Sequence, residues 1–335
     1  MEIPIVGAPL AGGPSTPELT ASVSGAGGLG FIAAGYKTAP EVGRDIEAVR
    51  TKTRRPFGVN IFFPVRLEVD DAPIVEYVSS LADEERRYGV ACGEPLWSDD
   101  EWDQKLELVE RERPAVVSFT FGCPDRTTVQ RLQANGIAIW CTVTGPAEAT
   151  VAAAAGVDAL VVQGAEAGGH RASFDDTDAA PIELLPLLQV ISGATELPLV
   201  AAGGIVDGRG VADAIAAGAS AAQVGTALML TPEAGTSPPQ RAAFDSGAPT
   251  SLTRAFTGRR ARGIVNRFMR EHDVAAPRAY PQIHYATAPL RAAARATGDA
   301  DGINLWAGQN YRQAKTESAA ALVTRWGAEA RRALL

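Results

Sequence analysis

Cysteine and lysine are scarce in this sequence, and their scarcity argues against several kinds of chemistry. The three cysteines, Cys92, Cys123 and Cys141, share no metal-ligand spacing and cannot all pair, which favours a reducing compartment. No lysine lies between Lys105 and Lys315, so a Schiff-base mechanism is disfavoured over that stretch. No cluster of histidines and carboxylates indicates a metal site, and we predict none.

Long apolar runs and basic runs are also missing. The apolar stretches fall short of the ~18 residues that a membrane-spanning helix needs. The formal net charge of -8 makes nucleic acid and anionic membranes unexpected partners. Met1 leads into the apolar residues 3–6 with no basic segment or cleavage site, so we expect no signal peptide. We therefore expect a cytoplasmic protein that acts on a small molecule; assembly into a homo-oligomer is left open.

Short apolar runs alternate with longer helical patterns, which predicts β-α units around a parallel sheet. Several runs are continuous Val, Ile and Ala stretches, as expected of strands buried on both faces. The chain length allows either one barrel or two ordinary domains, and eight units in one line favour a (β/α)8 TIM barrel. The predicted strands are residues 3–8, 29–33, 58–62, 115–121, 137–143, 159–163, 199–202 and 221–224.

Two segments break the rhythm of this α/β pattern. Residues 64–103 are too long for a plain connection, and the β-α pattern stops at about residue 250. We expect both segments to form a smaller, mostly helical cap domain over the barrel mouth. Residues 1–63 and 104–249 would then form the barrel, and residues 64–103 and 250–335 the cap.

The glycines at 25–30 match the G-x-G-x-x-G dinucleotide fingerprint in the wrong context. That fingerprint follows a strand and opens a helix, so that the helix N-terminus meets a pyrophosphate. Here a predicted helix precedes the glycines and a predicted strand follows them. A turn that ends the helix is therefore the favoured interpretation over a Rossmann site.

A stronger phosphate-binding signal lies at the ends of the seventh and eighth strands. Gly203 and Gly204 follow the seventh strand, and Gly225 and Thr226 follow the eighth. In TIM barrels these two loops commonly bind phosphate through backbone N–H groups, and glycine lets the backbone approach the oxygens. Gln223 and Thr226 add side-chain donors. Turn glycines without a ligand are the alternative.

The glycine-rich loop 163–170 follows the sixth strand and ends in one of the three histidines. Gln163 ends the strand itself. A lone histidine is usually structural, but His170 lies at the carboxyl end of a barrel strand, where catalytic residues gather. Since this loop carries no cysteine, a covalent thioimidate mechanism is disfavoured. Phosphate binding without a metal or a lysine nucleophile favours a bound flavin as the source of reactivity.

Two further residues at strand ends remain ambiguous. Cys123 follows the fourth strand and is more simply a small residue filling a turn than a nucleophile. Asn60 ends the third strand and either points toward the cofactor or satisfies a local turn.

With these motifs, the chain resembles the class I nitronate monooxygenases, formerly called 2-nitropropane dioxygenases, over essentially its whole length. The barrel motifs are shared with related FMN enzymes, including enoyl-reductases, whereas the tail motif at 304–309 is more particular to the nitronate enzymes. The sequence departs from the family at Gly7, where glutamine is frequent. The matching motifs are residues 8–13, 17–19, 26–30, 58–62, 163–170, 202–205, 223–226 and 304–309.

The resemblance implies bound FMN and oxidation of alkyl nitronates by O2 to a carbonyl compound and nitrite, with propionate 3-nitronate as the expected substrate. It places His170 beside the flavin as the catalytic residue. With the strand-end glycines, the expected cofactor-binding residues are Asn60, Gln163, Gly168, Gly203, Gly204, Gln223, Val224, Gly225 and Thr226.

His170 would orient the nitro oxygens or stabilise their charge, or remove the α proton of a neutral nitroalkane. An anionic substrate favours a cationic pocket, for which Arg171 and the arginines at 254–262 are candidates, a solvated surface being the alternative. Two other functions stay open. One is an FMN-dependent NAD(P)H reductase of enoyl thioesters or quinones, and the other is a flavin-binding barrel without turnover.

Overall fold

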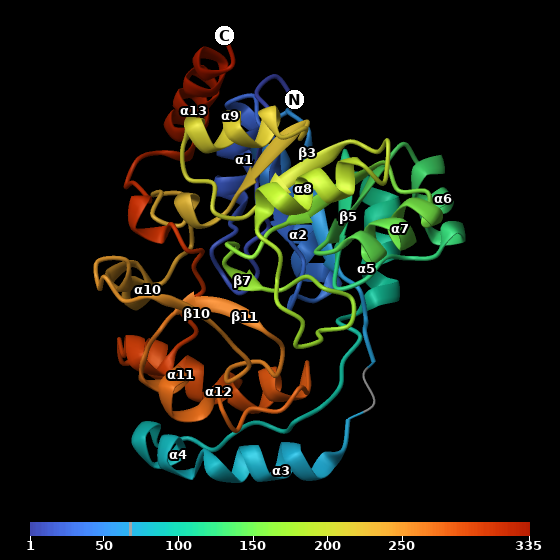
Figure 1. Ribbon diagram of the computed structural model, residues 1–335. Helices are drawn as coiled ribbons and strands as arrows, with labels where there is room; N and C mark the ends of the chain where they lie inside the picture. Colours follow the sequence, from blue (N-terminus) through green and yellow to red (C-terminus); the bar gives the residue numbers. More distant parts are fainter. Residues whose placement is uncertain (67–68) are drawn as a thin grey trace.

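Eight parallel strands form the centre of the computed structural model, which describes residues 1–66 and 69–335 (Figure 1). The Gly7 N–H donates to the Leu29 carbonyl at 2.9 Å, which joins the first strand to the start of the second and closes the sheet. The predicted (β/α)8 barrel is confirmed, and each predicted strand overlaps an observed one. In spatial order the strands are β1 (Ile5–Gly7), β9 (Ala221–Val224), β8 (Leu199–Ala202), β6 (Ala159–Gln163), β5 (Ala138–Val143), β4 (Val116–Thr120), β3 (Phe57–Phe62) and β2 (Gly30–Ala33).

The barrel strands read as continuous apolar runs because both of their faces are buried. On β6, Leu160 and Val162 belong to a large apolar cluster that also contains helix residues such as Leu187. Val161, between them, belongs to a second cluster with Trp140, in which the buried residues come from the strands and their ends. Successive side chains therefore alternate between the helix layer and the barrel interior.

Helices surround the barrel and begin at polar residues that cap them. Thr16 accepts a hydrogen bond from the Leu19 N–H, and Asp207 accepts one from the Gly210 N–H, so each helix start has one of its free N–H groups satisfied by a side chain. The first helix ends at Gly25 and β2 starts at Gly30, so the G-x-G-x-x-G motif lies in a turn from helix to strand. The helices are α1 (Pro17–Gly25), α2 (Ala39–Lys52), α5 (Trp102–Glu112), α6 (Arg126–Ala134), α7 (Pro146–Ala155), α8 (Leu184–Ser192) and α9 (Gly208–Ala216).

The remaining elements gather mostly at one end of the barrel, the lower part of Figure 1. There α3 (Asp71–Ser80) and α4 (Ala82–Tyr88) lie against α12 (Gln282–Ala296). Their core contains Tyr77, Phe256 and Phe268. The C-terminal helix α13 (Ala319–Ala333) differs, since it packs on α9 and α1 of the barrel. The proposed division into barrel and cap residues stays a prediction.

A second sheet connects the barrel to these elements. Its strands are β10 (Thr250–Thr253), β11 (Ala261–Ile264) and β7 (Gly169–His170), in the order β10-β11-β7. His170 pairs with Ala261, so the loop after β6 is held as an edge strand. Short elements complete the chain: α10 (Pro238–Ala243), α11 (Arg267–His272), η1 (Thr226–Leu228), η2 (Ala300–Gly302) and η3 (Tyr311–Gln313).

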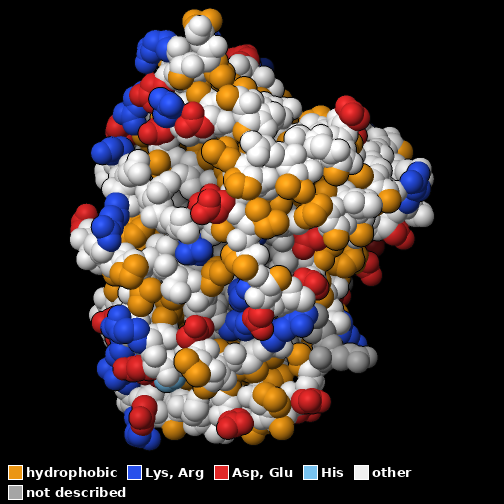
Figure 2. Space-filling view, in the orientation of Figure 1, with side chains coloured by type: hydrophobic (Ala, Val, Ile, Leu, Met, Phe, Trp, Pro, Cys, Tyr) orange, Lys and Arg blue, Asp and Glu red, His pale blue; other side chains and the backbone are white. Residues whose placement is uncertain are grey.

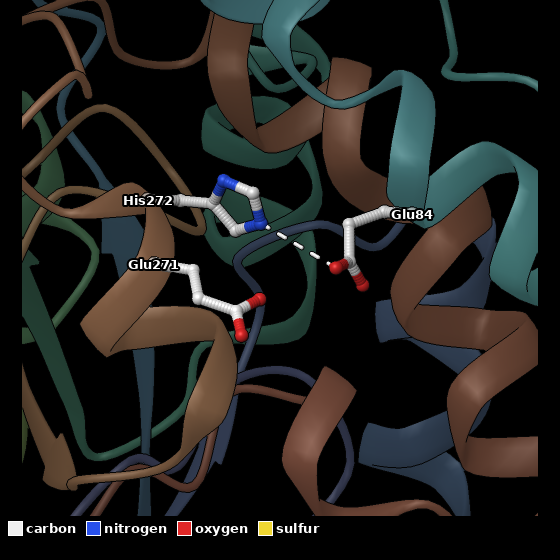
Figure 3. A group of neighbouring side chains, drawn as sticks. All are labelled: Glu84, Glu271 and His272. Atoms are coloured by element: carbon white, nitrogen blue, oxygen red, sulfur yellow. Dashed lines mark hydrogen bonds and ion pairs between the residues drawn. The ribbon is translucent and has the colours of Figure 1, made fainter.

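A buried carboxylate, Glu84, joins α4 to α11 (Figure 3). Arg267 donates to both of its oxygens, at 2.7 Å through Nη2, and also pairs with Glu271 at 2.5 Å. His272 Nε2 lies 3.5 Å from the same carboxylate. Because the Arg267 guanidinium already pairs with both carboxylates, the group forms an ion-pair network in which the guanidinium occupies the place of a cation and would repel a metal ion.

The charges on the surface are mixed in sign. On the face that Figure 2 draws, basic and acidic side chains are interspersed, so that face has no broad patch of one sign. None of the described helices combines the length and the apolar character needed to cross a membrane.

Candidate active site

A cavity of about 440 Å³ lies where the carboxyl ends of the barrel strands meet the 250–310 region. Strand-end residues such as Asn60, Thr142 and Gln163 line one part, and His284 and Trp306 line another. Its volume falls in the range of small-molecule sites, roughly 300–1,000 Å³. This is the end of a TIM barrel at which active sites form.

The sequence-predicted site residues converge on this cavity with one exception. Val224 is buried in the barrel core and is not among the described residues that line the cavity. Its backbone carbonyl accepts a hydrogen bond from the Ala8 N–H at 2.9 Å, so its role is to hold the first strand. The residues predicted from the sequence that do line the cavity are His170, Asn60, Gln163, Gly168, Gly203, Gly204, Gln223, Gly225 and Thr226.

The ends of β8 and β9 have the geometry of an anion site. Gly203 and Gly204 have φ values of +125° and +71°, which L side chains rarely adopt. Thr226 is the first residue of η1, where N–H groups point outward from the helix start. Among the described residues, no acceptor is recorded for the N–H groups of Gly204 or Thr226. Two unpaired donors in a cavity wall suit a phosphate group.

Gly168 is required by the tail of the chain. A Cβ at this position would lie 2.4 Å from the backbone nitrogen of Gly308. Gly308 in turn donates from its N–H to Thr226 Oγ1 at 3.0 Å. The glycine-rich loop and the tail motif therefore pack backbone to backbone beside the anion site.

Asn60 presents its oxygen as a hydrogen-bond acceptor. Its Nδ2 donates to Ser118 Oγ and Thr120 Oγ1, both at 2.9 Å, which fixes the orientation of the amide. Asn60 is 2% exposed and lines the cavity, and no donor to its Oδ1 is recorded among the described residues. This arrangement suits an N–H of a planar ring.

Gln163 holds the loop that follows it. Its Nε2 donates to the His170 carbonyl at 3.1 Å, and its Oε1 accepts from the Ala172 N–H at 3.0 Å. One hydrogen of Nε2 remains available to a ligand. Gln163 therefore positions His170 whether or not it also contacts a cofactor.

His170 is enclosed by aromatic rings. The rings of Phe121, Tyr280 and Trp306 lie with their centroids 5.6 to 5.7 Å from the imidazole. Burial, with a smaller effect from the charges of Arg259 and Arg291, lowers the pKa of His170 to about 3. The imidazole is therefore neutral at physiological pH.

The hydroxyl of Thr257 determines which ring nitrogen of His170 carries the hydrogen. Thr257 Oγ1 lies 2.9 Å from His170 Nε2 and donates its own hydrogen to the Arg259 carbonyl at 3.1 Å. Since a hydroxyl has one hydrogen, it accepts from the Nε2–H of His170. The other ring nitrogen, Nδ1, is then an acceptor.

The cationic part of the cavity wall was not predicted from the sequence. Arg291 on α12 is 7% exposed, and Arg295 follows one turn later; both line the cavity. Burial lowers the pKa of Arg291 to about 10, so it stays charged at neutral pH. No Asp or Glu occurs among the described residues of the wall. The sequence signal that could have indicated this cationic wall is the spacing of Arg291 and Arg295, which places both side chains on one face of a helix.

The arginines considered from the sequence as candidates for this role, with a solvated surface as the alternative, do not line the described cavity wall, so the hypothesis that they form the cationic pocket is wrong. Arg171 donates to the carbonyls of Gln163 and Gly164, and Arg259 donates to the Ser173 carbonyl. These contacts brace the loop after β6, and the described cavity wall includes none of the candidates. The same holds for the others of the set: Arg254 and Arg260 pair with Asp176, and Arg262 donates to Ala165.

Cys123 also lies outside the described cavity wall. It packs against the apolar core next to Cys141. This placement agrees with the interpretation of Cys123 as a small residue that fills a turn.

The sequence matches the nitronate monooxygenase family over residues 1–327. It is 42% identical over 333 residues to a nitronate monooxygenase of Pseudomonas aeruginosa, an alignment that covers 96% of this chain and 94% of the relative. The chain belongs to the nitronate monooxygenase family. The resemblance inferred from the motifs is thereby confirmed. The protein is a flavin-dependent oxidoreductase whose substrates are nitronates as a class.

Solved structures of two relatives share this architecture. A nitroalkane oxidase from Streptomyces ansochromogenes superposes with a TM-score of 0.96 at 47% identity, covering 99% of this chain and 98% of the other. FabK from Thermotoga maritima superposes with a TM-score of 0.77 at 26% identity, covering 100% and 94%. Both solved chains superpose on this one over nearly its whole length.

Proposed function

We propose that this member of the family binds FMN in the cavity and oxidises alkyl nitronates with O2 to a carbonyl compound and nitrite, with propionate 3-nitronate as a preferred substrate. The observation that carries the proposal is the charge of the cavity wall. Arg291 is buried there with no carboxylate among its described partners, in a protein of net charge -8. A buried cation without a counter-ion calls for an anionic ligand.

The barrel part of the cavity fits FMN. The N–H groups of Gly204 and Thr226 are available to a phosphate, and the Asn60 Oδ1 and the free Nε2 hydrogen of Gln163 are available to a polar ring edge. Gly168 lets the loop after β6 pack against the backbone of Gly308 where both residues line this cavity. When bound, the flavin supplies the redox centre that exchanges electrons with the nitronate and with O2.

The substrate is held by charge on the other side. Propionate 3-nitronate carries a negative nitronate group and a carboxylate, and Arg291 and Arg295 offer two positive charges one helical turn apart. Arg291 is anchored by donating to the His284 carbonyl at 2.8 Å and to Thr287 Oγ1 at 3.1 Å. Its guanidinium is therefore fixed before an anion arrives, which reduces the entropic cost of binding.

His170 contributes a neutral acceptor beside the substrate. Its Nδ1 lone pair can accept the α proton of a nitroalkane, whereas a nitronate has already lost that proton. The surrounding rings of Phe121, Tyr280 and Trp306 exclude water from this position.

Aerobic turnover tests the proposal. The FMN-loaded protein is mixed with propionate 3-nitronate, and nitrite and O2 consumption are followed, with free FMN as the background control. We expect nitrite release well above that background. Absence of nitrite, together with rapid anaerobic bleaching of the flavin by NADH or NADPH, would instead identify the reductase function.

A further inference from the structure

His284 lines the cavity on the same side as Arg291 and Trp306. It lies on α12, two turns before Arg291, and its half-buried side chain lines the cavity. Its imidazole stacks on the ring of Tyr36, with centroids 3.9 Å apart and planes within 5°. A histidine held face to face against an aromatic ring has a fixed orientation.

Tyr36 is itself held from both sides. Its N–H donates to Asp100 Oδ1 at 3.0 Å, and its hydroxyl accepts from the Tyr280 hydroxyl at 3.0 Å. The backbone at Tyr36 has a φ of 66°, a left-handed conformation that a residue other than glycine keeps only when its surroundings impose it. The surface on which His284 rests is therefore rigid.

Arg291 sets the position of the proton on His284. Its Nη2 lies 3.3 Å from His284 Nδ1, and a guanidinium can only donate. Nδ1 is therefore the acceptor, and the neutral ring carries its hydrogen on Nε2. Burial, with a smaller effect from the Arg291 charge, lowers the pKa of His284 well below its usual value, which keeps the ring neutral.

The Nε2–H of His284 is a donor without a partner. Among the residues that the structure describes, no acceptor is recorded for it. His170 presents an acceptor to the same cavity, so it does not supply a hydrogen bond to the oxygens of a nitronate. Donors for those oxygens must come from other residues of the wall, which include Arg291 and Arg295 with their charge and His284 with a neutral N–H.

We propose that His284 is a second substrate-binding residue, whose Nε2–H donates a hydrogen bond to an oxygen of the nitronate group. This inference rests on the proposed function, since it assumes that the nitronate binds in this cavity. His284 and Arg291 then act together: the arginine supplies charge and selects the tautomer, and the histidine supplies a directed donor.

Two amide substitutions separate this role from a structural one. In His284→Gln, the amide nitrogen reaches the position of Nε2 and keeps a donor there. In His284→Asn, the shorter amide reaches only the position of Nδ1, so it retains a group near Arg291 and loses the donor. Both variants lose the stacked ring equally, so each is a control for the other.

We expect His284→Asn to lower kcat/KM for propionate 3-nitronate by about 10- to 100-fold, the value of a hydrogen bond to a charged group, and His284→Gln to retain most of it. An equal loss in both variants would assign His284 a packing role and overturn the proposal. Wild-type activity in His284→Asn would overturn it as well.

The tautomer is measurable without turnover. The chain has three histidines, His170, His272 and His284, so ¹⁵N NMR of the imidazole nitrogens in the holoenzyme gives a simple spectrum, assigned with the variants. We expect the hydrogen of His284 on Nε2, and a hydrogen on Nδ1 would overturn the proposal. Because this readout needs no substrate, it still tests the donor if the wild-type enzyme releases no nitrite, a result that would contradict the proposed function alone.

Discussion

The Nε2–H of His170 donates to Thr257 Oγ1 at 2.9 Å, which leaves the Nδ1 of His170 as a hydrogen-bond acceptor. A group that accepts a proton matters for a neutral nitroalkane and much less for a preformed nitronate. Because its pKa of about 3 makes His170 a weaker base than one whose pKa matches the operating pH, we predict that His170→Asn lowers kcat/KM for a nitroalkane by about 10-fold, less than the roughly 100-fold or more of a well-matched general base. For the corresponding nitronate the loss is predicted to be several times smaller.

The two substrates are compared by nitrite release at one pH, with the nitronate prepared in alkali and added last. Retention of FMN is checked by absorbance in the same samples. Equal losses for the two substrates would show that His170 does not act through proton transfer.

The pH dependence follows from the low pKa of His170, which is about 3 because of burial and the nearby Arg259 and Arg291 charges. The ring is protonated only below that value, so at about pH 5 and above it is already neutral. We predict that kcat/KM for a preformed nitronate shows no ionisation of His170 between about pH 5 and 8. An inflection near pH 6.5 that disappears in His170→Asn would contradict this.

The same shift makes a prediction about stability. In the unfolded chain His170 titrates near its ordinary pKa of about 6.5, so between that pH and about 3 the unfolded state binds more protons. His170 therefore contributes to acid destabilisation as the pH falls through this window. Urea titrations of the wild type and His170→Phe at several pH values test this, and an identical pH dependence in the two proteins would refute it.

The barrel was predictable because each strand is an apolar run that can be recognised from its own local sequence, without knowledge of the strands it pairs with. The cavity residues at strand ends, such as Gly204, were predictable because a TIM barrel brings all carboxyl ends together. Arg291 and His284 were not, since α12 comes from a region with no strand rhythm. Only folding shows which of the many arginines face the cavity and which brace a loop, as Arg171 does.

The proposed phosphate site at Gly204 gives a prediction that a second glycine, Gly218, controls. Gly204 and Gly218 have φ values of +71° and +100°, so alanine at either position costs roughly 1–2 kcal/mol of backbone strain. Only Gly204 lines the cavity. We predict that Gly204→Ala is purified with little FMN, while Gly218→Ala retains it; the ratio of flavin to protein absorbance measures this. Full retention of FMN in Gly204→Ala would place the phosphate elsewhere.

The buried carboxylate of Glu84 predicts which ion pair between α4 and α11 contributes most to stability. Glu84→Gln removes the buried one of the two carboxylates that pair with Arg267, and we expect a loss of about 3 kcal/mol in the free energy of unfolding. Glu271 pairs with the same arginine but is half exposed, so Glu271→Gln is expected to cost less than about 1 kcal/mol. Urea denaturation measures both. A similar cost in the two variants would mean that burial of the Glu84 pair is not what matters.

The central claim is that a nitronate bound in this cavity reduces a bound flavin directly. The most direct test is the visible spectrum of the FMN-loaded protein under anaerobic conditions, before and after addition of propionate 3-nitronate. We predict loss of the oxidised flavin bands on addition of the nitronate, and their return when O2 is admitted, with nitrite released. A spectrum that the nitronate leaves unchanged, but that NADH or NADPH bleaches, would contradict the account.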